Sequence, residues 1–133
     1  MVSKTFKAEK SDLIHIRKFI KNFLIESTIK DDLQYQIILA SGEATMNIVQ
    51  HAYRGGDASK KIKVDLDLTD QTLTLNFFDE GIKVDPLKIK PRKLEDIRPG
   101  GLGTHFIKMV IDNVQWGESK DNWVNHLILI KKI

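Results

Sequence analysis

The sequence contains no cysteine, which excludes a disulfide framework and any metal site built on thiolates. It also has no apolar run that reaches the roughly 18 residues needed to cross a membrane. Residues 1–7 lack the apolar stretch of a signal peptide. We therefore expect a protein of a reducing, soluble compartment, the cytoplasm, with no membrane partner.

A large excess of one charge is missing as well. The 21 Lys and Arg side chains against 18 Asp and Glu leave a net charge of +3, and both signs are interspersed along the chain. This pattern argues against direct binding of nucleic acid. Apolar residues make up 41% of the 133 residues, which is enough for one hydrophobic core. A single domain spanning residues 1–133 is therefore expected.

Hydrophobic periodicity predicts two helices in the first half of the chain. Residues 3–8 alternate weakly and are compatible with an edge strand. Residues 12–27 carry apolar side chains at helical spacing, with Ser11 or Asp12 available as the N-cap. A second helix is expected to begin near Asp31 and to end at Gly55-Gly56.

The second half of the chain predicts four further strands and a helix. Residues 61–68 and 72–79 alternate around a turn and form a hairpin. All three prolines lie between residues 86 and 99, which predicts an irregular segment of the kind that forms lids. A helix over residues 104–112 and a hairpin of residues 114–118 and 123–131 complete an α+β fold. It is expected to be a two-layer α/β sandwich with helices on one face of a mixed β-sheet.

Three polar residues lie four apart on the second predicted helix, so Glu43, Asn47 and His51 share one stripe of its surface. They are compatible with a base, a metal ligand and an orienting group, or with an ordinary solvated face. Gly42 in mid-helix costs about 1 kcal/mol relative to alanine, which suggests a close approach by another group. Ser41, Ala44 and Thr45 add small side chains of the kind that line a ligand wall.

Two glycine-containing turns are further candidates. Asp79-Glu80-Gly81 follows an apolar strand, where a carboxylate either belongs to the turn or accepts a hydrogen bond from an exocyclic amine such as that of adenine. Gly100, Gly101 and Gly103 precede a helix, whose first amides could bind phosphate. The pattern is neither a P-loop nor a dinucleotide fingerprint. The four histidines show no metal-ligand spacing.

Taken together, three segments resemble the nucleotide-binding boxes of the histidine-kinase-like ATPases, which share the Bergerat ATP-binding fold. The segments are residues 43–53, residues 79–86, and Gly100-Gly101-Leu102-Gly103 with Asp112. The Asn47-x-x-x-His51-Ala52-Tyr53 ending resembles the bacterial anti-sigma factor serine kinases in particular. The resemblance spans residues 10–132. Asn125 stands near the last strand, where the family often has a glycine, and its role stays open.

The resemblance implies a role for each site residue. Glu43 would be the catalytic base, and Asn47 would bind Mg²⁺. Asp79 and Gly81 would recognise adenine. The remaining ATP-binding positions would be His51, Arg98, Gly100, Gly101, Leu102, Gly103 and Thr104.

The resemblance also implies a function. The protein would sequester a sigma factor, phosphorylate a serine of an antagonist protein (an anti-anti-sigma factor), and form a homodimer. Two other functions stay open, namely a nucleotide-dependent binding module that transfers no phosphate and an ATP hydrolase without a protein substrate.

Overall fold

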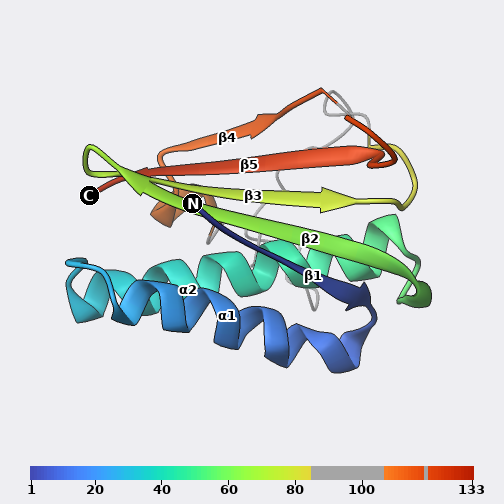
Figure 1. The fold of residues 1–133 in the computed structure, drawn as a ribbon, viewed down its shortest axis with the longest axis horizontal. Coiled ribbons are helices and arrows are strands. Elements are labelled where there is room, and N and C mark those ends of the chain that lie inside the picture. Colours follow the sequence, from blue (N-terminus) through green and yellow to red (C-terminus); the bar gives the residue numbers. More distant parts are fainter. Residues whose placement is uncertain (85–106, 119) are drawn as a thin grey trace, which may run out of the picture.

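The computed structural model describes residues 1–84, 107–118 and 120–133. These residues form one five-stranded sheet in the order β1-β2-β3-β5-β4 (Figure 1). The strands are β1 (Val2–Ala8), β2 (Asp57–Thr69), β3 (Thr72–Asp79), β4 (Asn113–Trp116) and β5 (Asn125–Lys132). Both predicted hairpins and the weak N-terminal strand are confirmed, and β1 lies at one edge of the sheet.

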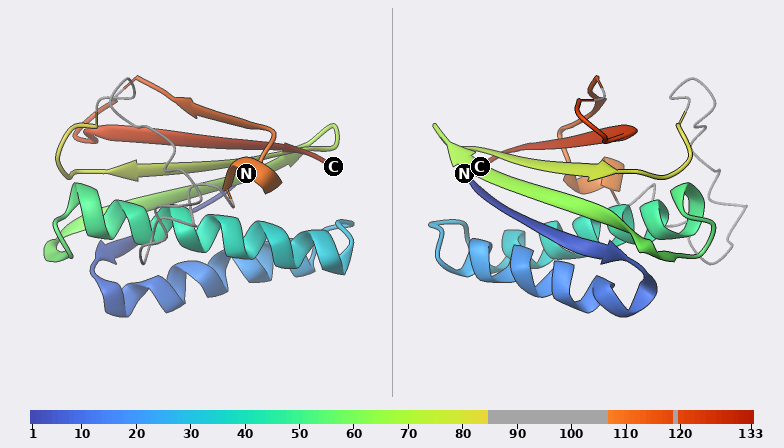
Figure 2. Two further views of the ribbon diagram at one scale, coloured as in Figure 1. Left: turned by 180° about the vertical axis from the view of Figure 1, so that it is seen from behind. Right: turned by 45° about the vertical axis from the view of Figure 1, so that its right-hand side comes forward.

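The helices form the second layer. They are the short 3₁₀ turn η1 (Lys10–Asp12), α1 (Leu13–Ile25), α2 (Asp31–Asn47) and the π-helical turn η2 (Ile48–Ala52). α1 and α2 lie side by side under one face of the sheet, as both views in Figure 2 show. Residues 107–110 are also helical and lie on this face. Within the described part of the chain, no helix is both long and apolar enough to cross a membrane.

Every neighbouring pair of described strands is antiparallel, so the α+β sandwich is confirmed but its sheet is not mixed. The connection between β1 and β2 explains the difference. α1 carries the chain back along the sheet and α2 carries it forward again, so β2 begins where β1 ends. Ala8 accordingly lies opposite Asp57.

The core lies between the two layers because each element has one apolar stripe or face. α1 buries Ile16, Ile20 and Leu24 almost completely, at a spacing of four residues. Buried and more exposed side chains alternate along β2 and β3, and those such as Val64 and Leu75 are fully buried. Burying one such side chain contributes about 1.5–3 kcal/mol.

The ends of the helices differ in detail from the sequence prediction. Asp12 directly precedes α1, but its carboxylate accepts a 2.9 Å hydrogen bond from the Lys7 amide and caps no amide of α1. The second helical segment is α-helical only to Asn47 and continues as the π-turn η2. It ends at Arg54, Gly55 and Gly56, all with positive φ, as a glycine-rich helix end requires.

Candidate active site

The predicted polar stripe is present at the C-terminal half of the second helix. Glu43 and Asn47 are half-buried on α2, and His51 is exposed on η2. None of the three side chains forms a hydrogen bond with another described residue. The described part of the protein therefore leaves their polar atoms open to a ligand. Since an α-helix rises 1.5 Å per residue, Asn47 lies about 6 Å further along the axis of α2 than Glu43, and His51 follows on the next turn, in η2.

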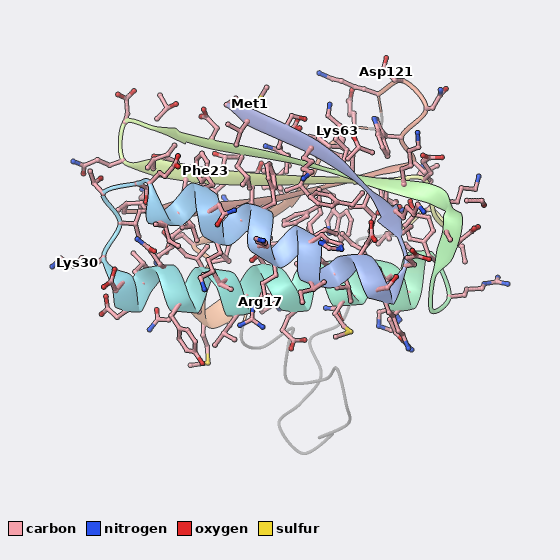
Figure 3. All side chains as sticks on the ribbon, turned by 60° about the horizontal axis from the view of Figure 1, so that its bottom comes forward. Met1, Arg17, Phe23, Lys30, Lys63 and Asp121 are labelled. Carbon is pink, nitrogen blue, oxygen red and sulfur yellow. The ribbon has the colours of Figure 1, made fainter. Side chains whose placement is uncertain are left out.

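The three small side chains around Glu43 mainly pack into the core, and of the three only Thr45 also borders a surface hollow. Ser41, Ala44 and Thr45 are each 2% exposed and belong to the core face of α2. A Cβ built on Gly42 would meet no atom within 4 Å, so no described group makes the close approach that the sequence suggested. Gly42 and Glu43 instead border a hollow of about 330 Å³ between α1 and α2. It lies in the helical layer that faces the viewer in Figure 3, near the labelled Arg17.

Asp79, the last residue of β3, is 2% exposed. Its Oδ1 accepts hydrogen bonds from the Asn125 side-chain amide at 2.8 Å and the Gly81 backbone amide at 3.0 Å. No described group donates to Oδ2. Burial raises the pKa of the Asp79 carboxyl, while the bonds from Asn125 and Gly81 act in the opposite direction. The structure therefore provides a buried, oriented acceptor with one oxygen that receives no hydrogen bond from the described residues.

Asn125 organises the segment that follows Asp79. Its Nδ2 donates to Oδ1 of Asp79 and to the carbonyl oxygen of Ile82, both at 2.8 Å. Its Oδ1 accepts a 2.8 Å hydrogen bond from the Val84 amide. One side chain at the start of β5 thus holds residues 79, 82 and 84 together. The sequence left the role of Asn125 open, and these hydrogen bonds give it a structural one.

The Asp79 segment also contacts the end of the second helix. The Ile82 amide donates to the carbonyl oxygen of Ala52 at 2.8 Å. A Cβ on Gly81 would overlap that same oxygen and lie 2.7 Å from the Ala52 carbonyl carbon. Only glycine permits this approach. The contact brings the stripe that carries His51 and the turn that carries Asp79 to the same end of the molecule.

Several predicted residues lie outside the described part of the chain. They are Arg98, Gly100, Gly101, Leu102, Gly103 and Thr104. Asp112 is described, and its carboxylate accepts hydrogen bonds from the Lys132 amide at 2.7 Å and from Nζ of Lys131 at 3.2 Å. These bonds lower the pKa of Asp112 and join it to the end of β5. No group of His, Asp and Glu side chains among the described residues could hold a metal ion by itself.

Comparison with known proteins shows the family. Residues 6–131 match the family described as histidine kinase-like ATPase domain. The chain belongs to the histidine-kinase-like ATPase family. It is 32% identical over 101 residues to the serine/threonine-protein kinase BtrW of Bordetella bronchiseptica. This alignment covers 73% of the present chain and 69% of the relative. ATP is therefore the ligand that the domain type implies.

A solved histidine kinase domain has the same fold. The histidine kinase domain of the blue-light activated histidine kinase from Erythrobacter litoralis EL346 aligns with a TM-score of 0.55 and 15% identity. The alignment covers 90% of this chain, which spans only 58% of that solved chain. The two-layer architecture is therefore that of a histidine-kinase-like ATPase.

Two features of this ATPase domain were missed at the sequence level. Tyr53 is 7% exposed, and its hydroxyl forms hydrogen bonds to backbone groups of Lys61 and of Glu80, which lies 27 positions further along the chain. The carbonyl oxygen of Ala52, the last residue of η2, accepts from the Ile82 amide because the final carbonyls of a helix have no partner within it. A signal for Tyr53 existed in the sequence, since a tyrosine two residues before a Gly-Gly helix end lies where the chain turns back into the sheet.

Proposed function

We propose that this chain is a Mg²⁺- and ATP-dependent protein-serine kinase of the anti-sigma factor type. The proposal is supported by family membership, by the serine/threonine-protein kinase named among its relatives, and by the candidate site. In the reaction, the oxygen of a substrate serine attacks the γ-phosphorus of ATP. The bond to the β-phosphate oxygen breaks and ADP leaves.

The proposed ATP site combines candidate residues that the structure describes with others that lie outside the described residues. Asp79 accepts from the adenine amino group, and Gly81 lets the backbone approach the base. The buried Asp79 carboxylate, with one oxygen free of described donors, fits this role. Asn47 contributes a carboxamide oxygen to Mg²⁺, and phosphates and water supply the other ligands. Gly101 and Gly103 offer amides to the phosphates.

Glu43 is the residue that favours a kinase over a module that only binds nucleotide. Its half-buried carboxylate lies one helical turn before Asn47 and forms no hydrogen bond with a described residue. A base at this position can accept the proton of the serine hydroxyl as the phosphoryl group is transferred. A domain that only binds nucleotide has no need of a base there. Cationic side chains from residues 88–98 would neutralise charge on the departing phosphate.

The partners in this proposal are a sigma factor, which the protein sequesters, and an antagonist protein that carries the substrate serine. The protein acts as a homodimer in the cytoplasm. Specificity for these partners resides in protein surfaces and not in the ATP site. The site itself needs only ATP, Mg²⁺ and access for one serine side chain.

Phosphate transfer from γ-labelled ATP to candidate antagonist proteins tests the proposal. We expect the wild type to label an antagonist on serine. Glu43→Gln should lose about 10²–10⁴-fold in rate while binding ATP normally, because only the base is removed. Glu26→Gln, an exposed residue at the end of α1, is the matched control. Equal labelling by the Glu43→Gln variant would exclude Glu43 as the base.

The same assay separates the two other functions. ATP binding without labelling of any partner by either protein would indicate a nucleotide-dependent binding module. Steady phosphate release in the absence of a partner would indicate an ATP hydrolase.

A further inference from the structure

The side chain of Tyr53 joins three segments at the edge of the candidate ATP site. Tyr53 directly follows η2 and is 7% exposed. Its hydroxyl lies 2.5 Å from the carbonyl oxygen of Lys61 in β2 and 2.6 Å from the amide nitrogen of Glu80. A phenol has one hydrogen, so it must donate to the carbonyl and accept from the amide. Both partners are backbone groups, whose chemistry a change of side chain does not alter.

The Glu80 amide belongs to the segment that presents Asp79. On the helix side, this segment is held by the hydroxyl of Tyr53 and by the bond from Ile82 to the carbonyl of Ala52. On the sheet side it is held by Asn125. The helix side connects the segment to the same helical run that carries Asn47. The separation between the adenine acceptor and the Mg²⁺ ligand therefore depends on the contacts at residues 52 and 53.

The hydroxyl of Tyr53 stays protonated through the physiological range. Burial raises its pKa well above the ordinary tyrosine value, and the negative charges of Asp79 and Glu80 act in the same direction. The bond from the Glu80 amide opposes this shift. The donor to Lys61 and the acceptor for Glu80 are thus present at every pH at which the protein would work.

We propose that Tyr53 is a positioning residue for adenine recognition, which acts by holding the Glu80 amide and thereby fixing Asp79 and Gly81 against the second helix. It does not touch the nucleotide. The inference rests on the proposed ATP site and adds to it a residue outside the nucleotide contacts. Its predicted signature is weaker ATP binding with an unchanged maximal rate, because the reacting groups themselves stay in place.

Tyr53→Phe in the full chain tests this role, since it removes only the hydroxyl. Tyr35→Phe is a matched control because Tyr35, in α2, is 60% exposed and forms no hydrogen bond to a described residue. Loss of one hydrogen bond to this partly buried amide should speed hydrogen exchange of the Glu80 amide about tenfold and weaken ATP binding about five- to tenfold. The rate at saturating ATP should stay within about twofold. Tyr35→Phe should leave all three quantities unchanged.

The readouts are amide exchange by NMR in the absence of nucleotide, and calorimetric titration with ATP and Mg²⁺. Wild-type affinity in a folded Tyr53→Phe variant would overturn the role of Tyr53 and leave the ATP site standing. No ATP binding by the wild type would overturn both proposals. Rapid exchange of the Glu80 amide in the wild type would also refute the role of Tyr53, and that measurement needs no variant.

Discussion

Asn125 on β5 donates a 2.8 Å hydrogen bond from Nδ2 to Oδ1 of Asp79, the residue directly opposite on β3. Both side chains are buried, with exposed fractions of 5% and 2%. No described cation lies within 4.0 Å of the Asp79 carboxylate. A carboxamide, and no described cation, therefore orients this carboxyl group as an acceptor for a ligand.

Asp79→Asn should abolish most ATP affinity and leave the fold intact. Asparagine has the same shape and can still accept from Asn125 and Gly81, but it presents no charged acceptor to adenine. Hydrogen bonds to charged groups contribute about 1.5–3 kcal/mol, so we expect a loss of about 10- to 100-fold. Calorimetric titration with ATP measures it. Asp67→Asn, at the far end of β2, is the control, and an unchanged affinity for the Asp79 variant would contradict the adenine assignment.

The stability of the same variant relative to wild type should depend on pH, because the buried Asp79 carboxyl has a shifted pKa. The pKa of Asp79 is raised by burial above the ordinary 3.8. Its contribution to stability is therefore fully present below pH 3.8 and is lost as pH rises through the raised pKa, where the buried group must ionise. Urea unfolding between pH 3.5 and about 8 should show Asp79→Asn gaining stability relative to wild type as pH rises. A difference that stays constant over this range would contradict the raised pKa.

Asn125→Asp should convert the same pair into a pH-sensitive one. Two carboxyl groups in hydrogen-bond contact are compatible when they share a proton, but they repel each other when both ionise. We expect near-wild-type stability close to pH 4 and a loss of about 2–4 kcal/mol by pH 8. Unfolding by urea at several pH values measures this. Asn113→Asp, on the exposed face of β4, should show no comparable slope.

Most of the fold could be predicted from the sequence because its signals are local. Alternation in residues 61–79 and helical spacing in residues 13–24 reflect one buried face per element. Glu43 and Asn47 could be placed on one helical stripe for the same reason. The antiparallel direction of the two hairpins follows from their turns, whereas that of the β1–β2 and β3–β5 pairs depends on how the connections cross the sheet, which no local pattern records.

The contacts that complete the candidate site could not be predicted, because their partners are distant in the chain. Tyr53 meets Glu80 across 27 positions, and Asn125 meets Asp79 across 46. The π-turn after Asn47 has no compositional signal, and the Ala52 carbonyl that ends it meets an Ile82 amide distant in the chain. Such contacts follow from the packing of the helices on the sheet.

Alanine at Gly81 and at Gly42 should act in opposite directions. In Gly81→Ala the new Cβ would overlap the carbonyl of Ala52, so the turn must shift. We expect a destabilisation of about 1–3 kcal/mol, together with weaker ATP binding. Gly42→Ala meets no atom within 4 Å and should stabilise the protein by about 0.5–1 kcal/mol through helix propensity. Urea unfolding of both variants checks this, and a stabilising Gly81→Ala would refute the close contact.

The hairpin between β2 and β3 offers a prediction remote from the site. Its two turn residues, Asp70 and Gln71, have φ angles of 51° and 61°, as a two-residue turn of type I′ requires. Left-handed backbone costs a non-glycine residue about 1–2 kcal/mol, whereas glycine adopts it freely at a smaller entropic cost. Gln71→Gly should therefore stabilise the protein by about 0.5–1 kcal/mol in urea unfolding.

The gain at residue 71 should depend on backbone freedom alone. The bond from the Ile133 amide to the Gln71 carbonyl, 2.8 Å long, uses only backbone atoms and persists in the Gln71→Gly variant. Gln71→Ala removes the same side chain but keeps a Cβ, so it should give no gain. Equal stabilisation by alanine and glycine would mean that the glutamine side chain, and not its left-handed backbone, limits stability at this turn.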